Sequence, residues 1–322
     1  MLPLLFKKFF KTSFSHNQIY LCDMETLNEC PICYGQDFEP FIKCIDYTVS
    51  KETFQIVQCK KCDFKFTNPR PSQSEIGKYY ESEDYISHSN SKKGLFNLVY
   101  QTIRNVTLQG KVKLINSFNC QTKKLLDIGC GTGEFLNAAK LAGWTVEGLE
   151  PGESARSYGV KTFGLTVNDL GHLENFQPET FDVITMWHVL EHVPDLHRML
   201  KQISKILKPS GTLVVAVPNG EAFEERKYAN VWAAYDLPRH LNHFTVKSAT
   251  NLFKINNLKV FNKKSMPFDP FYISMLSEKY KGSGMFGMGA KGLINGLQSN
   301  MAAFRNISKA SSIIYFVKKD NQ

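Results

Sequence analysis

Short apolar runs alternate with amphipathic segments from residue 123 onward, and this alternation constrains the fold more than any other feature. Strands are expected over 123–129, 144–150, 164–168, 181–187, 212–219, 258–266 and 311–319, with helices over 133–143, from 152, over 194–211 and over 245–257. Strands that alternate with helices in this way form a parallel sheet covered on both faces. The predicted fold class is α/β, a Rossmann-like, seven-stranded and mostly parallel sheet.

The first of these strands leads into the turn "LLDIGCGTGEFL". Three glycines occupy alternate positions in it: Gly129, Gly131 and Gly133. Glycine permits positive φ and lets a ligand approach the main chain. Glu134, which follows the last glycine, would repel the pyrophosphate that a GxGxxG turn holds. Asp127 suits a cationic amino group, and Glu150 can accept hydrogen bonds from ribose hydroxyls. A ribose, a positive charge and no phosphate together match S-adenosylmethionine (SAM).

Four stretches occur in an order that resembles the class I SAM-dependent methyltransferases, in particular the ubiquinone-type and sugar-modifying group: "LLDIGCGTGEFL", "GWTVEGLEP", "FDVITMWHVLEHVPD" and "LKPSGTLVVAVPN". The resemblance is dense over 120–265. It implies that the three glycines pass the methionine part of SAM, that Asp127 helps to hold it and that Glu150 takes the ribose. It also implies that residues after the third and fourth strands border the cofactor: Asn168, Asp169 and Leu170 near the adenine, then Trp187 and His188.

Two CxxC pairs precede this region, Cys30 with Cys33 and Cys59 with Cys62. Two residues between thiolates let both sulfurs reach one Zn²⁺, so the doubled pair predicts a closed, structural four-cysteine zinc site. Disulfides are the alternative, and a reducing cytosol disfavours them. Alternating and β-branched residues over 38–59 predict two strands. The module is therefore expected to be a small, zinc-ribbon-like β unit.

These features divide the chain. We expect a basic tail over 1–24, the ribbon-like module over 25–72, a linker and helical lead-in over 73–118 and the methyltransferase domain over 119–322. The lead-in should contain a short helix near 73–82 and a longer one over 94–118. No stretch approaches the roughly 18 uncharged apolar residues of a membrane span, and the first residues lack the features of a signal peptide. The expected location is cytoplasmic.

Histidines and a glutamate gather after the fourth and fifth strands. His188, Glu191 and His192 lie in "HVLEH", and His240 and His243 lie in "LPRHLNHFT". Both segments reach the ligand edge of the sheet, so the four histidines are candidate catalytic residues, with His192 or His240 favoured as a general base. A divalent metal at His188, Glu191 and His192 is an alternative. Small-RNA 2′-O-methyltransferases have a similar set with glutamate at the first position. A third possibility is that the turn only caps the strand.

Residues 268–304 interrupt the hairpin expected of the last two strands. The segment mixes aromatic residues, methionines and several glycines, a composition that suits a lid or an acceptor pocket. A membrane-facing or dimer-forming patch is the alternative.

The leading functional hypothesis is a SAM-dependent methyltransferase acting on a small-molecule or sugar-like acceptor, with oxygen favoured over carbon. A cysteine-rich module before the domain also resembles sugar C-methyltransferases, which implies nucleotide-sugar or polysaccharide acceptors. The net charge of +9 favours anionic partners, but the lysines are scattered. An RNA methyltransferase is therefore less favoured, because the ribbon shows little aromatic–basic interleaving beyond "KCDFKF". A non-catalytic SAM-fold scaffold is the remaining alternative.

Overall fold

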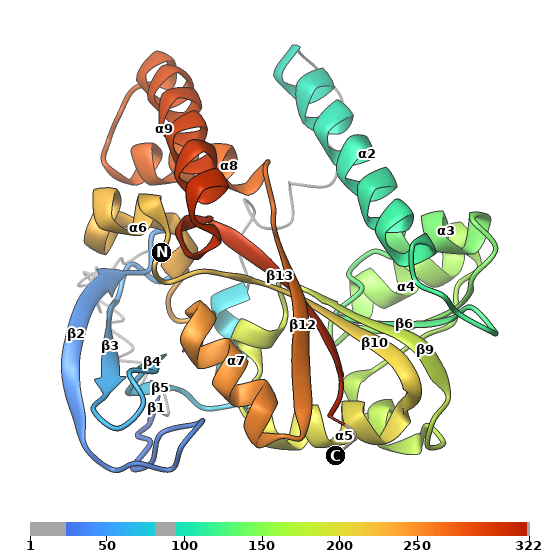
Figure 1. The fold of residues 1–322 in the computed structure, drawn as a ribbon. Helices are drawn as coiled ribbons and strands as arrows, with labels where there is room; N and C mark the ends of the chain where they lie inside the picture. Colours follow the sequence, from blue (N-terminus) through green and yellow to red (C-terminus); the bar gives the residue numbers. More distant parts are fainter. Residues whose placement is uncertain (1–23, 81–94, 321–322) are drawn as a thin grey trace, which may run out of the picture.

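A seven-stranded sheet lies at the centre of the computed structural model, which describes residues 24–80 and 95–320 (Figure 1). In spatial order its strands are β12 (Leu258–Ser265), β13 (Ser312–Lys319), β10 (Leu207–Pro218), β9 (Phe181–Trp187), β6 (Lys124–Ile128), β7 (Thr145–Leu149) and β8 (Val167–Asn168). Only β13 runs antiparallel to its neighbours in this sheet. The prediction of a Rossmann-like, mostly parallel, seven-stranded sheet is confirmed.

Successive side chains on the central strands point to opposite faces of the sheet and so enter two separate cores. Leu126 and Ile184 belong to the core on one face, and Leu125 and Val183 to the core on the other. The helices that cover the first face are α5 (Leu196–Ile206) and α7 (Val246–Ile255), and those on the second are α2 (Leu95–Asn116), α3 (Glu134–Leu141) and α4 (Glu153–Phe163). The result is a three-layer α/β/α arrangement.

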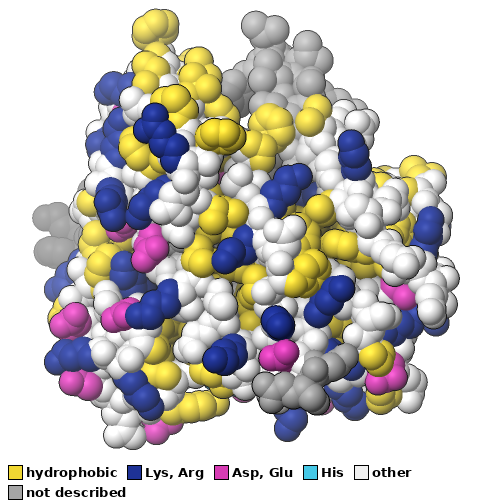
Figure 2. All heavy atoms as spheres, in the orientation of Figure 1, with side chains coloured by type: hydrophobic (Ala, Val, Ile, Leu, Met, Phe, Trp, Pro, Cys, Tyr) yellow, Lys and Arg dark blue, Asp and Glu magenta, His cyan; other side chains and the backbone are white. Residues whose placement is uncertain are grey.

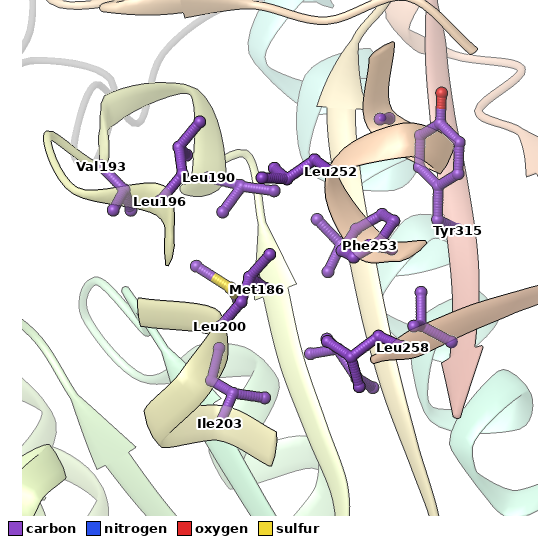
Figure 3. Packing of buried hydrophobic residues seen from close by; sticks show 14 of the residues in the cluster. Met186, Leu190, Val193, Leu196, Leu200, Ile203, Leu252, Phe253, Leu258 and Tyr315 are labelled. Atoms are coloured by element: carbon purple, nitrogen blue, oxygen red, sulfur yellow. The ribbon is translucent and has the colours of Figure 1, made fainter. Parts of the chain in front are cut away.

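Helix α5 shows how the apolar pattern fixes these layers. Its residues Leu196, Leu200 and Ile203 are buried and belong to one cluster with Met186 of β9 and Leu252 of α7 (Figure 3). Their spacing of three and four residues places them on one side of the helix. Asp195 begins the helix by accepting a hydrogen bond from the Arg198 amide (3.0 Å).

The amino-terminal module is a small antiparallel sheet. Its strands are β2 (Phe38–Ile45), β3 (Thr53–Cys59) and β4 (Lys65–Thr67), and a further pair is formed by β1 (Met24–Glu25) and β5 (Arg70–Pro71). The two strands expected over 38–59 are therefore present. The sheet has a fourth strand, β11 (Asn242–His243), which comes from the main domain and pairs with β4. A buried ion pair between Arg239 and Asp46 (3.0 Å) joins the same two regions.

Three predicted elements differ from the structure. The helix expected to reach Gly211 ends at Ile206, because Pro209 disfavours helical backbone at the residue before it and β10 already begins at Leu207. The third strand shrinks to Val167–Asn168. The helix expected near 73–82 is a 3₁₀ helix, η1 (Ile76–Tyr80). Residues 1–23 of the expected basic tail and 81–94 of the linker lie outside the described residues.

The segment 268–304 contains two helices, α8 (Asp269–Tyr280) and α9 (Met285–Arg305), which pack against each other (Figure 1). Glycines on α9 permit this contact. A Cβ added at Gly292 would collide with Met275, and one at Gly296 would collide with Phe271. The α8/α9 hairpin, as we call it below, lies beside α6 (Phe223–Tyr228) at the carboxyl ends of β10 and β9.

Candidate functional site

Asp127 lies near the carboxyl end of β6, at the edge where the parallel strands end. Its side chain is only 3% exposed and accepts a hydrogen bond from the Thr185 hydroxyl of the neighbouring strand (2.6 Å). Burial raises the pKa of Asp127 to about 7, although Thr185 and the positive charge of Lys111 act to lower it. A positive charge bound beside Asp127, such as an ammonium group, would lower this pKa and keep the carboxylate ionised.

The glycine turn after Asp127 has the left-handed backbone that its sequence predicted. Gly129, Gly131 and Gly133 have φ values of 71°, 55° and 86°. A Cβ at Gly129 or Gly133 would strike the side chains of Val189 or Leu165, so packing requires glycine there. At Gly131, by contrast, a Cβ would have no neighbour within 4 Å. The glycine at 131 is therefore favoured by its positive φ and not by packing, and the side of the turn where its Cβ would lie is open.

Glu150, at the end of β7, is oriented by this turn. Its Oε2 accepts a hydrogen bond from the Gly131 amide (2.9 Å) and its Oε1 accepts one from the Gly152 amide (2.9 Å). A carboxylate has about four acceptor positions, so two remain for a ligand. Two hydroxyl groups on adjacent carbons fit that number.

The residues after β8 lie at the same edge, because β8 pairs with β7 in parallel. The Glu150 amide donates to the Asn168 carbonyl (2.9 Å), which sets the spacing between the two strand ends. Asp169 is exposed and its Oδ1 accepts a hydrogen bond from the Gly171 amide (2.7 Å), and Leu170 is half-buried at the start of η2 (Leu170–Asn175). Asn168 therefore lies beside Glu150 at this edge of the sheet, and Asp169 and Leu170 follow it directly in the chain.

A lysine from α2 reaches the same edge and had not been predicted. The Lys111 Nζ lies 4.3 Å from the centre of the Trp187 ring and interacts with the charges of Asp127 and Asp269. Burial lowers the pKa of Lys111, and the two aspartates oppose this shift. The indole Nε1 of Trp187 is buried without a hydrogen-bond partner among the described residues. A tryptophan nitrogen left in this way is a free donor at the end of β9.

His188 is held by two carboxylates. Its Nε2 lies 3.1 Å from Asp269 of α8 and its Nδ1 lies 3.4 Å from Glu191. Burial disfavours the charged ring, but the two carboxylates outweigh burial and raise the pKa of His188 to about 10. The ring is therefore protonated at neutral pH, and it has no lone pair to act as a base or a metal ligand.

A second cluster contains Glu191, His192 and His240. One ligand atom from each lies within 4.8 Å of the other two. The Nδ1 of His192 contacts the Arg239 carbonyl (2.9 Å) and the Nδ1 of His240 contacts the Ala234 carbonyl (2.9 Å). Because a carbonyl only accepts, the His240 Nδ1 carries the proton and its Nε2 presents a lone pair. The His192 Nδ1 also lies 3.0 Å from the Tyr80 hydroxyl.

The electrostatics of this cluster fit a cation. Burial lowers the pKa of His240 to about 4, with the charge of His192 adding to the effect, so His240 is neutral at pH 7. Glu191 is 1% exposed, and apart from the ion pair of its Oε1 with His188 its carboxyl oxygens have no hydrogen-bond partner among the described residues. The set predicted for a divalent metal was His188, Glu191 and His192. The structure instead brings His240 to Glu191 and His192, and binds His188 to Asp269.

His243 lies apart from this cluster. Its Nε2 is 3.1 Å from the Thr67 hydroxyl, which itself donates to the His240 carbonyl (2.7 Å). The ring packs edge-on against Tyr235 with centroids 5.6 Å apart. Burial lowers the pKa of His243 well below its ordinary value. The structure therefore assigns His243 to the contact between the main domain and β4.

The four predicted zinc ligands converge. Cys30 Sγ lies 3.6 Å from Cys62 Sγ, Cys33 Sγ lies 3.6 Å from Cys59 Sγ, and the four sulfur atoms are all within 4.8 Å of one another. Tetrahedral Zn²⁺ with Zn–S bonds of about 2.3 Å requires sulfur atoms about 3.8 Å apart. None of the four forms a disulfide. The geometry fits a four-sulfur metal site.

Most of the main domain resembles known methyltransferases in sequence. A family described as "Methyltransferase domain" matches residues 100–263. The ubiquinone biosynthesis O-methyltransferase of Pseudomonas syringae pv. tomato is 33% identical over 111 residues, 31% of this chain and 47% of that protein. The same enzyme of Actinobacillus pleuropneumoniae serotype 5b is 38% identical over 109 residues, 30% and 46% of the two chains. The chain thus spans about half the length of these curated relatives.

Among solved structures, a geranyl diphosphate methyltransferase in complex with SAM matches 73% of this chain and 95% of its own. Its TM-score is 0.50 at 14% sequence identity, a likeness of fold alone. No helix among the described residues is long and apolar enough to cross a membrane.

Proposed function

The chain belongs to the methyltransferase-domain family, and from this premise we propose that it transfers a methyl group from SAM to a hydroxyl oxygen of a small-molecule acceptor. The observation that carries the proposal is the arrangement of Asp127, the glycine turn and Glu150 at one edge of the sheet. The names of the relatives, O-methyltransferases of ubiquinone biosynthesis, support oxygen as the methylated atom.

The residues at this edge fit SAM by their chemistry. The two free acceptor positions of Glu150 suit the ribose hydroxyls, and Asp127 suits the amino group of the methionine part. Lys111 offers a positive charge for the carboxylate of that same part. Trp187, with its free Nε1, borders the cleft beside them. Asn168, Asp169 and Leu170 are proposed to border the adenine.

A pair of glycine variants tests cofactor binding. Gly131 and Gly143 both have positive φ, 55° and 87°, and a Cβ at either meets nothing within 4 Å. Alanine at either position should therefore cost a similar amount of stability, about 1 kcal/mol. In calorimetric titration with SAM, Gly131→Ala should weaken binding at least about tenfold because its methyl group enters the cofactor path. Gly143→Ala should bind like the wild type. Wild-type protein that does not bind SAM would refute the proposal.

The acceptor end of the site is proposed to be the cluster of Glu191, His192 and His240. SAM supplies a methyl carbon that is already activated, so the protein needs to orient the acceptor oxygen and remove its proton. The ring nitrogens of His192 and His240, together with the Glu191 carboxylate that also pairs with His188, are a suitable ligand set for a divalent cation, which would lower the pKa of a bound hydroxyl group. Without a cation, His192 or His240 would take the proton as general base. His188, being protonated, is proposed to position Glu191.

Chelation separates these two mechanisms. Treatment with EDTA followed by Mn²⁺ should abolish and then restore methylation of a catechol test acceptor if a cation is needed. Calorimetry on the EDTA-treated protein measures Mn²⁺ binding directly. The binding should be lost in Glu191→Gln and retained in His172→Gln, whose imidazole lies outside the cluster. Activity that survives EDTA but falls in His240→Gln would instead support a histidine base.

The cysteine module is proposed to hold a structural Zn²⁺ through Cys30, Cys33, Cys59 and Cys62. A closed four-sulfur site has no open position for a substrate. Metal analysis of the purified chain should find zinc, and Cys59→Ser should lose it. The four-sulfur site and the histidine cluster offer different ligand types. Mn²⁺, which prefers oxygen and nitrogen ligands, therefore reports on the histidine cluster.

We also propose that the chain divides after residues 24, 72 and 118, that the α8/α9 hairpin is a lid beside the acceptor, and that the protein is cytoplasmic. A nucleotide sugar or a polysaccharide is a further proposed acceptor. The comparisons favour neither the RNA methyltransferase nor the non-catalytic scaffold.

A further inference from the structure

Helix α9 is amphipathic with its sides reversed. The residues that it buries are small or polar: Gly292, Asn295, Gly296 and Ser299. The residues that it exposes include its large apolar ones: Met285, Phe286, Leu293, Ile294, Leu297, Met301 and Phe304. A helix on the surface of a water-soluble domain normally turns its apolar side toward the core. We call the exposed apolar set the α9 face.

The α9 face is one contiguous stripe and not scattered single residues. At 100° per residue, Phe286, Leu293, Leu297 and Phe304 fall on nearly the same line along the helix, with Ile294 and Met301 beside it. Phe286 is 91% exposed and Phe304 is 95% exposed. Figure 2 shows hydrophobic side chains gathered on the surface that lies over α9 in Figure 1, with lysine or arginine beside them. Exposed apolar patches of this kind mark surfaces that bind a partner.

The charges around the face have one sign. From residue 279 to residue 309 the sequence has five basic residues and no aspartate or glutamate. Arg305 and Lys281 are exposed, and so is the side chain of Lys291, although Lys291 also pairs with Glu278. Glu278 and Asp269 are the acidic residues of the α8/α9 hairpin, and both are largely withdrawn from solvent, with side chains 5% and 22% exposed. The hairpin therefore presents apolar and positive groups together.

We propose that the α9 face docks on an anionic lipid surface. A helix with large apolar residues on its outer side and Lys or Arg at its flanks lies in the plane of a membrane interface and not across it. The anionic head groups attract the flanking cations while the phenylalanines enter the acyl boundary. This orientation agrees with the composition of α9, which at 21 residues is long enough to span a membrane but is not apolar enough.

Two other partners could cover the α9 face: a second copy of the chain and the segment before residue 24. The positive charge of both disfavours them. In a two-fold dimer the same patch meets itself, so the positive rim of one copy would face the positive rim of the other. The segment before residue 24 is apolar in part, but Lys7, Lys8 and Lys11 make it basic as well. Neither complements a positive rim, whereas an anionic lipid does.

Vesicle co-sedimentation of the full chain tests the proposal. The wild type should bind phosphatidylcholine vesicles that contain about one third phosphatidylglycerol, and should bind much less to pure phosphatidylcholine or in about 0.5 M NaCl. The double variant Phe286→Ser/Phe304→Ser should lower the partition coefficient by at least about tenfold. Both side chains are almost fully exposed, so thermal unfolding should be unchanged. Arg305→Glu should weaken binding about fivefold.

A matched control and three outcomes decide the matter. Leu141 on α3 is 81% exposed and lies away from α9, so Leu141→Ser should bind vesicles like the wild type. The proposal is overturned if the wild type stays in the supernatant. It is also overturned if the double variant binds as well as the wild type, because another segment then carries the binding. Light scattering that shows a wild-type dimer lost in the double variant would assign the face to a second copy instead.

Discussion

Helices α5 and α9 are both strongly one-sided, yet they turn opposite sides to the protein. In α5, Leu196, Leu200 and Ile203 enter the core between β9 and α7. In α9, glycine and polar residues face inward and the phenylalanines face out. The comparison teaches that apolar periodicity identifies a helix and its apolar side, but does not say what covers that side.

The two helices also differ in how they are attached. Helix α5 is held by apolar burial in the main core. The α8/α9 hairpin is held in large part by polar contacts: Asn295 with the Tyr228 hydroxyl, Lys227 with Asn295, and Asp269 with His188. The hairpin therefore responds to pH and to single polar substitutions in a way that α5 should not.

The largest expected difference comes from removing one leucine from each helix. Leu200→Ala leaves a cavity in a fully buried site and should cost about 2–5 kcal/mol of unfolding free energy. Leu297 is 52% exposed, so Leu297→Ala should change the free energy of unfolding by no more than about 0.5 kcal/mol. Urea denaturation of both variants measures the difference. Equal losses would mean that the α9 face is buried in the free protein.

A glycine pair within α9 sharpens the comparison between its two sides. Gly296→Ala places a methyl group against the Phe271 ring and should cost about 1–3 kcal/mol. Gly289 is exposed and has open space at its Cβ, so Gly289→Ala should stabilise the helix by up to about 1 kcal/mol. Thermal unfolding followed by circular dichroism reports both. If the two changes had the same sign, α8 and α9 would not be in close contact.

The smallest effect is pH dependence at the hairpin. The pKa of His188 rises from 6.5 to about 10, so its stabilising contribution is complete below pH 6.5 and is lost as pH rises toward 10. Asp269→Asn removes one of the two carboxylates, so the free energy of unfolding should fall less steeply with rising pH. The difference from the wild type should be less than about 1 kcal/mol, because the His188 ring is partly exposed. Glu174→Gln is the control, because its surface partner Arg198 does not titrate in this range. Parallel pH profiles for all three proteins would contradict the prediction.

Much of the cofactor edge could be predicted because each residue directly follows a strand. Asp127, Glu150 and Asn168 end neighbouring parallel strands, and such ends meet at one edge of the sheet. Lys111 and Asp269 were not predicted, because each comes from a helix whose path across that edge depends on tertiary packing. The same reason explains why His240 replaced His188 in the histidine cluster.

The glycines misled the prediction elsewhere. The glycines of 268–304 belong to a composition that suits a lid or an acceptor pocket, but Gly292 and Gly296 are where α8 approaches the backbone of α9. The end of α5 was misplaced because Gly211 was taken as the stop signal, whereas Pro209 acts first. Both errors arise from treating a glycine as a local signal when its cause is a neighbouring element or residue.

The strand β11 donated to the amino-terminal sheet has one more consequence. Thr67 of β4 holds the carbonyl of His240 and the ring of His243, so the fold of the cysteine module reaches one bond away from the acceptor cluster. If the module holds Zn²⁺ as we propose, loss of the metal should disturb the positions of His240 and His243 while leaving Asp127 and Glu150 in place.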